Sequence, residues 1–205
     1  MKIACVGNCQ LESLAWYIKY LLPKDECWWI SFSDRYKGYN LKQKLKTKRV
    51  KNNLFTKDFI DKVRCPHEPI QYIKSCDYVI YIKMSQHSSP NYHTEKLETY
   101  INENCKPVSV SNYYIAKGEY TKSLNLTVTK EKLNKGLDIS IAEIMNQENK
   151  NEMLPLAKRE PRHPPSNYFL KLLQLICNHF DWQYFSEEDH EMFLKVGFPH
   201  GSNTE

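Results

Sequence analysis

The first 22 residues constrain the fold of this chain more than any other segment, and they read MKIACVGNCQLESLAWYIKYLL. The apolar run at 2–6 predicts a buried strand, and the apolar spacing over 10–22 predicts an amphipathic helix that Pro23 ends. Cys9 is therefore expected where a buried strand meets the first turn of a helix. Backbone N–H groups and the positive end of the helix dipole favour a thiolate or a bound oxyanion at such a position. The segment thus predicts a candidate nucleophile at a strand-to-helix turn.

Strand and helix patterns alternate along the chain. Further strands are predicted at 27–32, 77–83 and 107–110, and helices at 58–63, 92–104, 137–145 and 166–180. Another helix is expected after Ser186, which has Asp189 three residues later in a pattern like a capping box. The alternation favours one α/β domain over 1–205 with a mainly parallel sheet. Residues 1–115 are expected to form the sheet, and 116–200 a helical half with a polar, Pro-rich loop at 146–165.

The composition limits the classes of protein that fit this chain. With 41% hydrophobic and 26% charged residues, it is expected to be globular. The net charge of +5 suits an anionic small molecule. We expect no nucleic-acid partner, because the chain has no RRM, KH, zinc-finger or Walker pattern. No apolar run approaches the roughly 20 residues needed to span a bilayer, so no membrane span is expected.

The cysteines indicate a reducing environment. The chain has 7 of them, an odd number with no CxxC pair, and no signal-peptide pattern precedes the first strand. We therefore expect free thiols in a cytoplasmic protein. The Cys and His spacing does not fit a zinc site, so no metal is expected.

Polar residues follow several predicted strands, and the carboxyl ends of parallel strands meet at one edge of a sheet, where ligands bind. These residues are Gly7, Asn8, Gln10, Ser85, Gln86, Asn112 and Tyr113. The backbone N–H groups of Cys9 and Gln10, together with side-chain amides, could hold an oxyanion or a sugar hydroxyl. The alternative is that Cys9 is a small residue in a turn and that the amides are satisfied locally.

Cys9 needs a base, and His163 is the best-placed histidine because the following proline holds it in a rigid loop. Glu160, three residues earlier, could orient the imidazole. The alternative is a loop histidine with no role. Arg162, Lys117 and the basic run at 42–51 could contact phosphates of a nucleotide-like cofactor, although a solvated face is the favoured interpretation.

The order of these features resembles the SGNH hydrolase and acyltransferase superfamily. In that pattern a nucleophile turn follows the first strand, an amide loop follows a later one, and an acid and a histidine three residues apart precede the last core helix. The corresponding residues here are Cys9, Ser85 with Gln86, and Glu160 with His163. Cys9 replaces the usual serine, and Asn8 and Glu160 replace the usual aspartates, which disfavours a plain esterase.

The tetrapeptide GNCQ at 7–10, with the late His163-Pro164 pair, is more specifically similar to the WcbI-type polysaccharide biosynthesis enzymes. This resemblance implies a Rossmann-like, SGNH-like three-layer domain. It also implies an acetyltransferase that binds coenzyme A and modifies sugars of a surface glycan. It supports Cys9 and His163 as the reacting groups.

The sequence therefore predicts transfer of an acetyl group from acetyl-CoA to a sugar hydroxyl or amine. In one version Cys9 forms an acyl-enzyme, and in the other His163 deprotonates the acceptor while the turn at Cys9 only holds the thioester. Two alternatives stay open: an SGNH-like esterase or deacetylase acting on a glycan, and a non-catalytic module that binds coenzyme A or a nucleotide.

Overall fold

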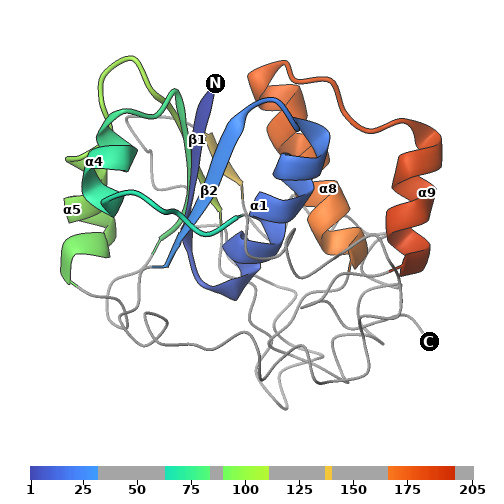
Figure 1. Ribbon diagram of the computed structural model, residues 1–205, viewed down its shortest axis with the longest axis horizontal. Helices are drawn as coiled ribbons and strands as arrows, with labels where there is room; N and C mark the ends of the chain where they lie inside the picture. Colours follow the sequence, from blue (N-terminus) through green and yellow to red (C-terminus); the bar gives the residue numbers. More distant parts are fainter. Residues whose placement is uncertain (32–62, 84–89, 111–136, 140–165, 197–205) are drawn as a thin grey trace, which may run out of the picture. The chain divides into compact units, whose positions relative to one another are not determined.

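The structure is a computed structural model, and it describes residues 1–31, 63–83, 90–110, 137–139 and 166–196 (Figure 1). The chain divides into two compact units, Met1–Pro107 and Val108–Glu205.

Parallel strands form the centre of the first unit. β1 (Lys2–Gly7) lies between β2 (Glu26–Ser31) and β3 (Tyr78–Ile82), and both neighbours run parallel to it. Ile3 pairs with Cys27 on one side and with Tyr78 on the other. β1 is buried from its second residue onward, as expected for a strand covered on both faces.

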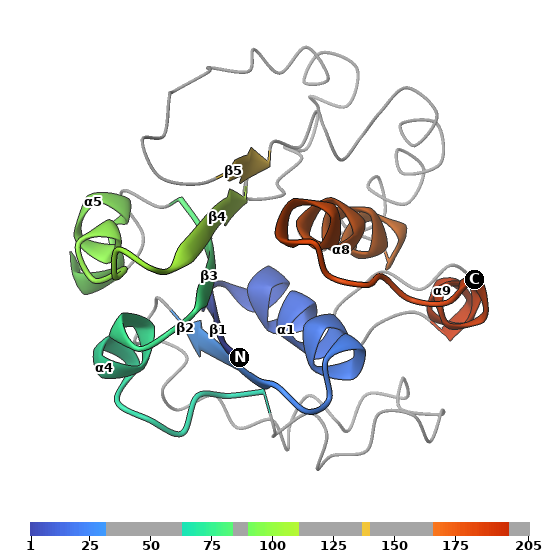
Figure 2. The same cartoon turned by 90° about the horizontal axis from the view of Figure 1, so that it is seen from above.

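Helices cover both faces of these strands. Figure 2 shows α1 (Cys9–Leu21) on one face, with α4 (Pro69–Lys74) and α5 (Thr94–Glu98) on the other. Cys27 and Ala15 mark the α1 face, since the Cys27 thiol lies 3.8 Å from the Ala15 carbonyl oxygen. The opposite face carries a buried apolar cluster: Ala4, Val6, Ile30, Tyr72, Ile73, Val79, Tyr81 and Leu97.

The boundary between the two units lies within β4 (Lys106–Val110). In the first unit, the Lys106 amide donates to the Asp77 carbonyl (2.9 Å), so β4 starts beside the start of β3. In the second unit, the end of β4 pairs in parallel with β5 (Leu137–Ile139). Two helices follow, α8 (Ser166–Phe180) and α9 (Glu187–Val196).

A short connection joins the two C-terminal helices. The Tyr184 hydroxyl lies 3.3 Å from the Leu170 carbonyl oxygen in α8 and 2.8 Å from His190 Nδ1 in α9. The rings of Phe185 and Phe193 pack with centroids 5.0 Å apart. These contacts fix α9 against the connection.

The α/β class and the parallel pairing expected from the sequence are confirmed. Strands lie at the four predicted places, although Phe32 of the second lies outside the described part, and the 166–180 helix is present. The first helix starts one residue early, at Cys9. The Ser186 cap is also confirmed, because its hydroxyl accepts from the Asp189 amide at 3.2 Å.

Two predicted helices need correction, and one helix was missed. Residues 137–139, placed in a helix, form β5, while 140–145 lie outside the described part. The 92–104 helix is reduced to the 3-10 turn Pro90–Tyr92 and α5. After Glu98 the backbone forms tight turns, in which the Tyr100 amide donates to the Leu97 carbonyl (2.9 Å), and the Asn102 side-chain amide donates to the carbonyls of Lys74 (3.1 Å) and Cys76 (3.0 Å). α4 was not predicted, and of the 58–63 helix only Val63 is described.

Among the residues that the structure places, no helix is long and apolar enough to cross a membrane.

Candidate functional site

The turn between β1 and α1 is built around Asn8. Its side-chain oxygen accepts a hydrogen bond from the Gln10 amide (2.9 Å), and its carbonyl accepts from the amides of Leu11 (3.0 Å) and Glu12 (3.2 Å). This is an N-cap, the arrangement that satisfies the unpaired donors of a first helical turn. Cys9 is therefore the first residue of α1.

Gly7 allows the helix to approach the end of β1. A Cβ atom at this position would lie 3.0 Å from Leu11 Cγ and 3.4 Å from Ile82 Cδ1. Carbon atoms pack at about 3.5–4.0 Å, so a larger residue would push Leu11 away. The glycine of the GNCQ tetrapeptide thus has a packing role.

The indole of Trp29 holds the same turn from the neighbouring strand. Its Nε1 lies 3.1 Å from the carbonyl oxygen of Gly7 and 3.1 Å from that of Asn8. Trp29 is 4% exposed, so these hydrogen bonds are shielded from water. The backbone just before Cys9 is therefore tied to β2.

Cys9 differs from most other cysteines of the chain in its exposure. No disulfide joins the cysteines, and Cys9 and Cys65 are partly exposed while the remaining five are buried. Burial raises the pKa of Cys177 to about 12 and that of Cys5 well above its usual value. Burial also raises the pKa of Cys65. The buried thiols are poor candidates for a nucleophile.

A partly buried ion pair lies one helical turn from Cys9. The Glu12 carboxylate is 5% exposed, and its Oε1 lies 3.4 Å from Arg64 Nη2. Arg64 belongs to a short segment that forms a parallel bridge with Trp29, and its guanidinium lies over the Trp29 ring, 5.6 Å from the centroid. Trp29 therefore connects the ion pair to the turn.

The structure describes only part of the predicted site. Gly7, Asn8, Cys9 and Gln10 are described, and they form the turn as expected. The remaining predicted residues lie outside the described part of the chain: Ser85, Gln86, Asn112, Tyr113, Lys117, Glu160, Arg162 and His163, with the runs 42–51 and 146–165. Their positions relative to Cys9 stay predictions.

The roles of Glu12, Trp29 and Arg64 were missed from the sequence. Glu12 could have been noticed, because it is a charged residue beside apolar positions of an amphipathic helix. Trp29 read as an ordinary strand residue, and nothing local marks Arg64. The backbone N–H of Gln10 also has a partner that the sequence could not reveal, since it donates to the side-chain oxygen of Asn8.

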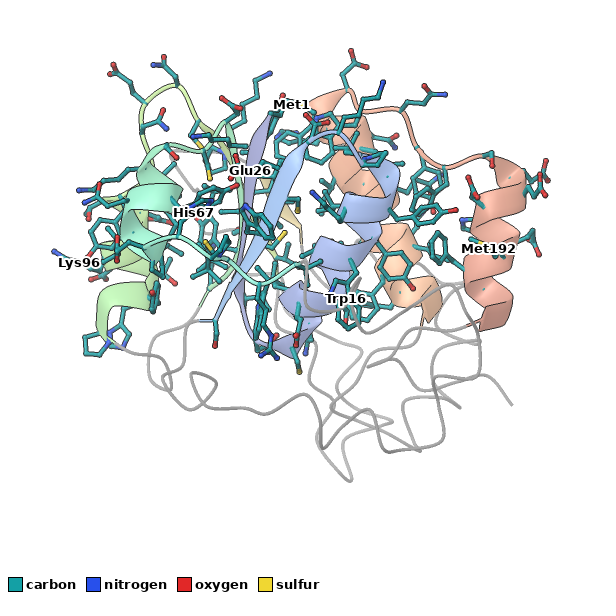
Figure 3. All side chains as sticks on the ribbon, viewed as in Figure 1. Met1, Trp16, Glu26, His67, Lys96 and Met192 are labelled. Atoms are coloured by element: carbon teal, nitrogen blue, oxygen red, sulfur yellow. The ribbon has the colours of Figure 1, made fainter. Side chains whose placement is uncertain are left out.

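A second polar cluster lies at the other end of the strands. Figure 3 shows Glu26 and His67 side by side, and His67 Nε2 lies 3.1 Å from Glu26 Oε1. The same oxygen accepts from the Trp28 indole (3.0 Å), and this hydrogen bond, with a smaller effect of His67, lowers the pKa of Glu26. Because Glu26 begins β2 whereas Cys9 follows the end of β1, the cluster is separate from the turn.

Within the described ranges, no group of three or more His, Cys, Asp or Glu side chains could hold a metal ion. Comparison of the chain with family models, with curated proteins and with solved structures found no match.

Proposed function

We propose that this chain is an acetyltransferase that uses Cys9 to move the acetyl group of acetyl-CoA to a hydroxyl or amine of a sugar in glycan biosynthesis. One observation carries the proposal: Cys9 is partly exposed and is the first residue of a 13-residue helix with a side-chain cap. A thiol at such a helix end is favoured as a thiolate, and an oxyanion is favoured there too.

The first chemical step forms an acyl-enzyme. The Cys9 thiolate attacks the thioester carbonyl carbon, and the new bond to Cys9 Sγ replaces the bond to the coenzyme A sulfur. The base that takes the Cys9 proton returns it to the departing coenzyme A thiolate. We assign this base to His163 and its orientation to Glu160, as the sequence predicts.

The second step releases the product. The sugar hydroxyl or amine loses a proton to the same base and attacks the acyl carbon, and the bond to Cys9 Sγ breaks. The base then returns the proton to the Cys9 sulfur, so the enzyme is regenerated.

Both steps need donors for the negative charge on the carbonyl oxygen. Because the Gln10 amide donates to Asn8, we assign this role to the Cys9 amide and the Asn8 side-chain NH₂. Arg162 and Lys117 remain the proposed phosphate contacts of coenzyme A, and Ser85, Gln86, Asn112 and Tyr113 the proposed sugar contacts.

Intact-protein mass spectrometry after mixing with acetyl-CoA tests the proposal. We expect a mass increase of one acetyl group that maps to Cys9, and release of free coenzyme A. Cys9→Ala should lose both signals, whereas Cys65→Ala, which removes the other partly exposed thiol, should keep them. His163→Ala should slow acetylation by roughly 10²–10⁴.

Other outcomes separate the alternatives. Full transfer activity in Cys9→Ala would rule out the acyl-enzyme and favour direct transfer by a base. Rapid hydrolysis of a chromogenic acetyl ester without coenzyme A would favour the esterase. Thermal stabilisation by coenzyme A with neither activity would favour a binding module.

A further inference from the structure

Three side chains near the turn that carries Cys9 are used by no step of the proposed chemistry: Trp29, Glu12 and Arg64. The Trp29 indole donates to the carbonyls of the two residues that precede Cys9, at 3.1 Å each. Since those carbonyls belong to Gly7 and Asn8, the indole fixes the backbone direction in which the chain enters α1. A shift of this backbone would move the Cys9 sulfur relative to the N-terminal end of α1, whose dipole favours the thiolate.

The ion pair adds an electrostatic element to the same turn. Glu12 is three residues after Cys9, so the two side chains share one face of α1, with Cβ atoms about 5–6 Å apart. A buried carboxylate at this distance disfavours a thiolate at Cys9. Arg64, at 3.4 Å from Glu12, offsets that charge. The Arg64 side chain is 31% exposed, so solvent partly screens its charge.

We propose that Trp29, Arg64 and Glu12 are positioning residues for the Cys9 thiol: Trp29 sets its direction, and the Arg64–Glu12 pair sets its charge state. The inference rests on the proposed function in one respect, because it takes Cys9 as the group that reacts. On this view, loss of Arg64 alone makes the thiol less reactive, and loss of Glu12 alone makes it more reactive.

Few other titratable groups face this turn among the described residues. Between Ile3 and Gly7 the only one on β1 is the Cys5 thiol, and between Cys27 and Ser31 the only one on β2 is the Cys27 thiol. Tyr81 of β3 belongs to the buried cluster on the opposite face of the strands. Both thiols are buried, so we take Glu12 and Arg64 as the charges that act on Cys9 at this end of α1.

The pH profile of Cys9 alkylation tests the inference. In a Cys65→Ser background, Cys9 is the one thiol of the chain that is not buried. The rate of its reaction with iodoacetamide is measured by peptide mass spectrometry over a range of pH. The pH at which this rate is half-maximal is the midpoint of Cys9 deprotonation. A unit charge about 6 Å away at a partly exposed site shifts such a midpoint by about 0.5–1 pH unit.

The two charges should shift this midpoint in opposite directions. Glu12→Gln removes a negative charge and should lower it, whereas Arg64→Gln leaves Glu12 uncompensated and should raise it. Arg64→Lys keeps the positive charge and should largely restore the parent value. A merely structural role would not produce this sign reversal and rescue.

The indole has its own matched control. Trp29→Phe keeps an aromatic ring but removes both hydrogen bonds to the turn, and it should raise the midpoint. Trp28→Phe, one residue earlier on β2, removes the hydrogen bond to Glu26 instead and should leave the midpoint of Cys9 unchanged. These two variants decide the inference even if Arg64→Gln does not fold.

The inference is overturned if Glu12→Gln and Arg64→Gln shift the midpoint in the same direction or leave it at the parent value. An equal effect of Trp29→Phe and Trp28→Phe would also overturn it. The assay needs no acetyl-CoA, so it separates the two proposals. Acetylation of Cys9 without the sign reversal refutes only the positioning role, and the sign reversal without acetylation refutes only the transferase.

Discussion

Replacing Gly7 with alanine tests whether the close approach of α1 to β1 is as tight as the structure indicates. The new Cβ would lie 3.0 Å from Leu11 Cγ and 3.3 Å from Leu11 Cβ. Leu11 is 1% exposed and Ile82, the other close neighbour, is 2% exposed, so neither side chain can move into solvent. Overpacking of this kind costs about 1–3 kcal/mol.

An opposing effect reduces this cost. Alanine restricts the unfolded chain more than glycine does, which favours folding by about 0.4–1 kcal/mol. The packing cost is the larger of the two, so the free energy of unfolding should fall by about 1–2 kcal/mol. For a chain of this size, that corresponds to a decrease in Tm of roughly 2–8 °C.

Urea unfolding of a double-mutant cycle measures the contact directly. Leu11→Ala alone should cost about 2–5 kcal/mol, because it empties a buried site. In the double variant the new Cβ has room, so the two effects should fall short of additivity by about 1 kcal/mol. Leu173→Ala, a buried leucine of α8 in the second unit, is the control and should combine additively with Gly7→Ala.

A variant Gly7→Ala that is as stable as the parent would refute the reasoning, and so would strict additivity with Leu11→Ala. Either result would mean that α1 lies farther from the end of β1 than described. The packing role assigned to the glycine of the GNCQ tetrapeptide would then be lost.

Three further predictions concern the exposure of the thiols, the Glu26 cluster and the cap of α9. Native alkylation at pH 8 should label Cys9 and, more slowly, Cys65, and spare the buried thiols, as peptide mass spectrometry would show; early labelling of a buried thiol would contradict the burial described. Trp28→Phe should raise the pKa of Glu26 toward its usual value in an NMR titration, because its indole hydrogen bond is the main cause of the lowered pKa. A carboxyl pKa that is lowered in the folded protein stabilises the fold above the pKa of the unfolded chain, and this stabilisation is lost as the pH falls through the pKa of the folded protein. The difference in stability between the parent and Trp28→Phe should therefore shrink in acid. A difference that stays constant with pH would argue against this link. Ser186→Ala should lower the free energy of unfolding in urea by about 1 kcal/mol through loss of the α9 cap, whereas Ser186→Asp should keep most of the stability of the parent.

The elements that follow from local patterns were predictable. β1 and α1 show strand and helix spacing in one continuous segment, and Ser186 is a strong capping residue placed before a helix. Residues 137–139 were wrongly assigned to a helix, although Leu137, Ile139 and Ile141 alternate with polar residues, which is the spacing of a strand. α4 is only 6 residues long, too short to show a helical period.

The site was predictable only where it is local. The residues of the Gly7–Cys9 turn are neighbours in the sequence, so strand, turn and helix signals find them together. Arg64 reaches Glu12 across 52 positions of sequence, and Trp29 reaches Gly7 across 22. Contacts of this kind depend on the pairing of β2 with β1 and with the 63–65 segment, which no local pattern encodes.

The bridge beside Trp29 has a consequence for the solubility of the chain. β2 ends the described strand order, and an exposed outer strand can recruit strands of other molecules. Here the Trp29 amide donates to the Val63 carbonyl (2.5 Å) and the Cys65 amide donates to the Trp29 carbonyl (3.0 Å). The central backbone groups of that outer strand are thus already occupied, and the segment that occupies them also carries Arg64. Protection against aggregation and alignment of the Cys9 turn would then depend on the same few residues.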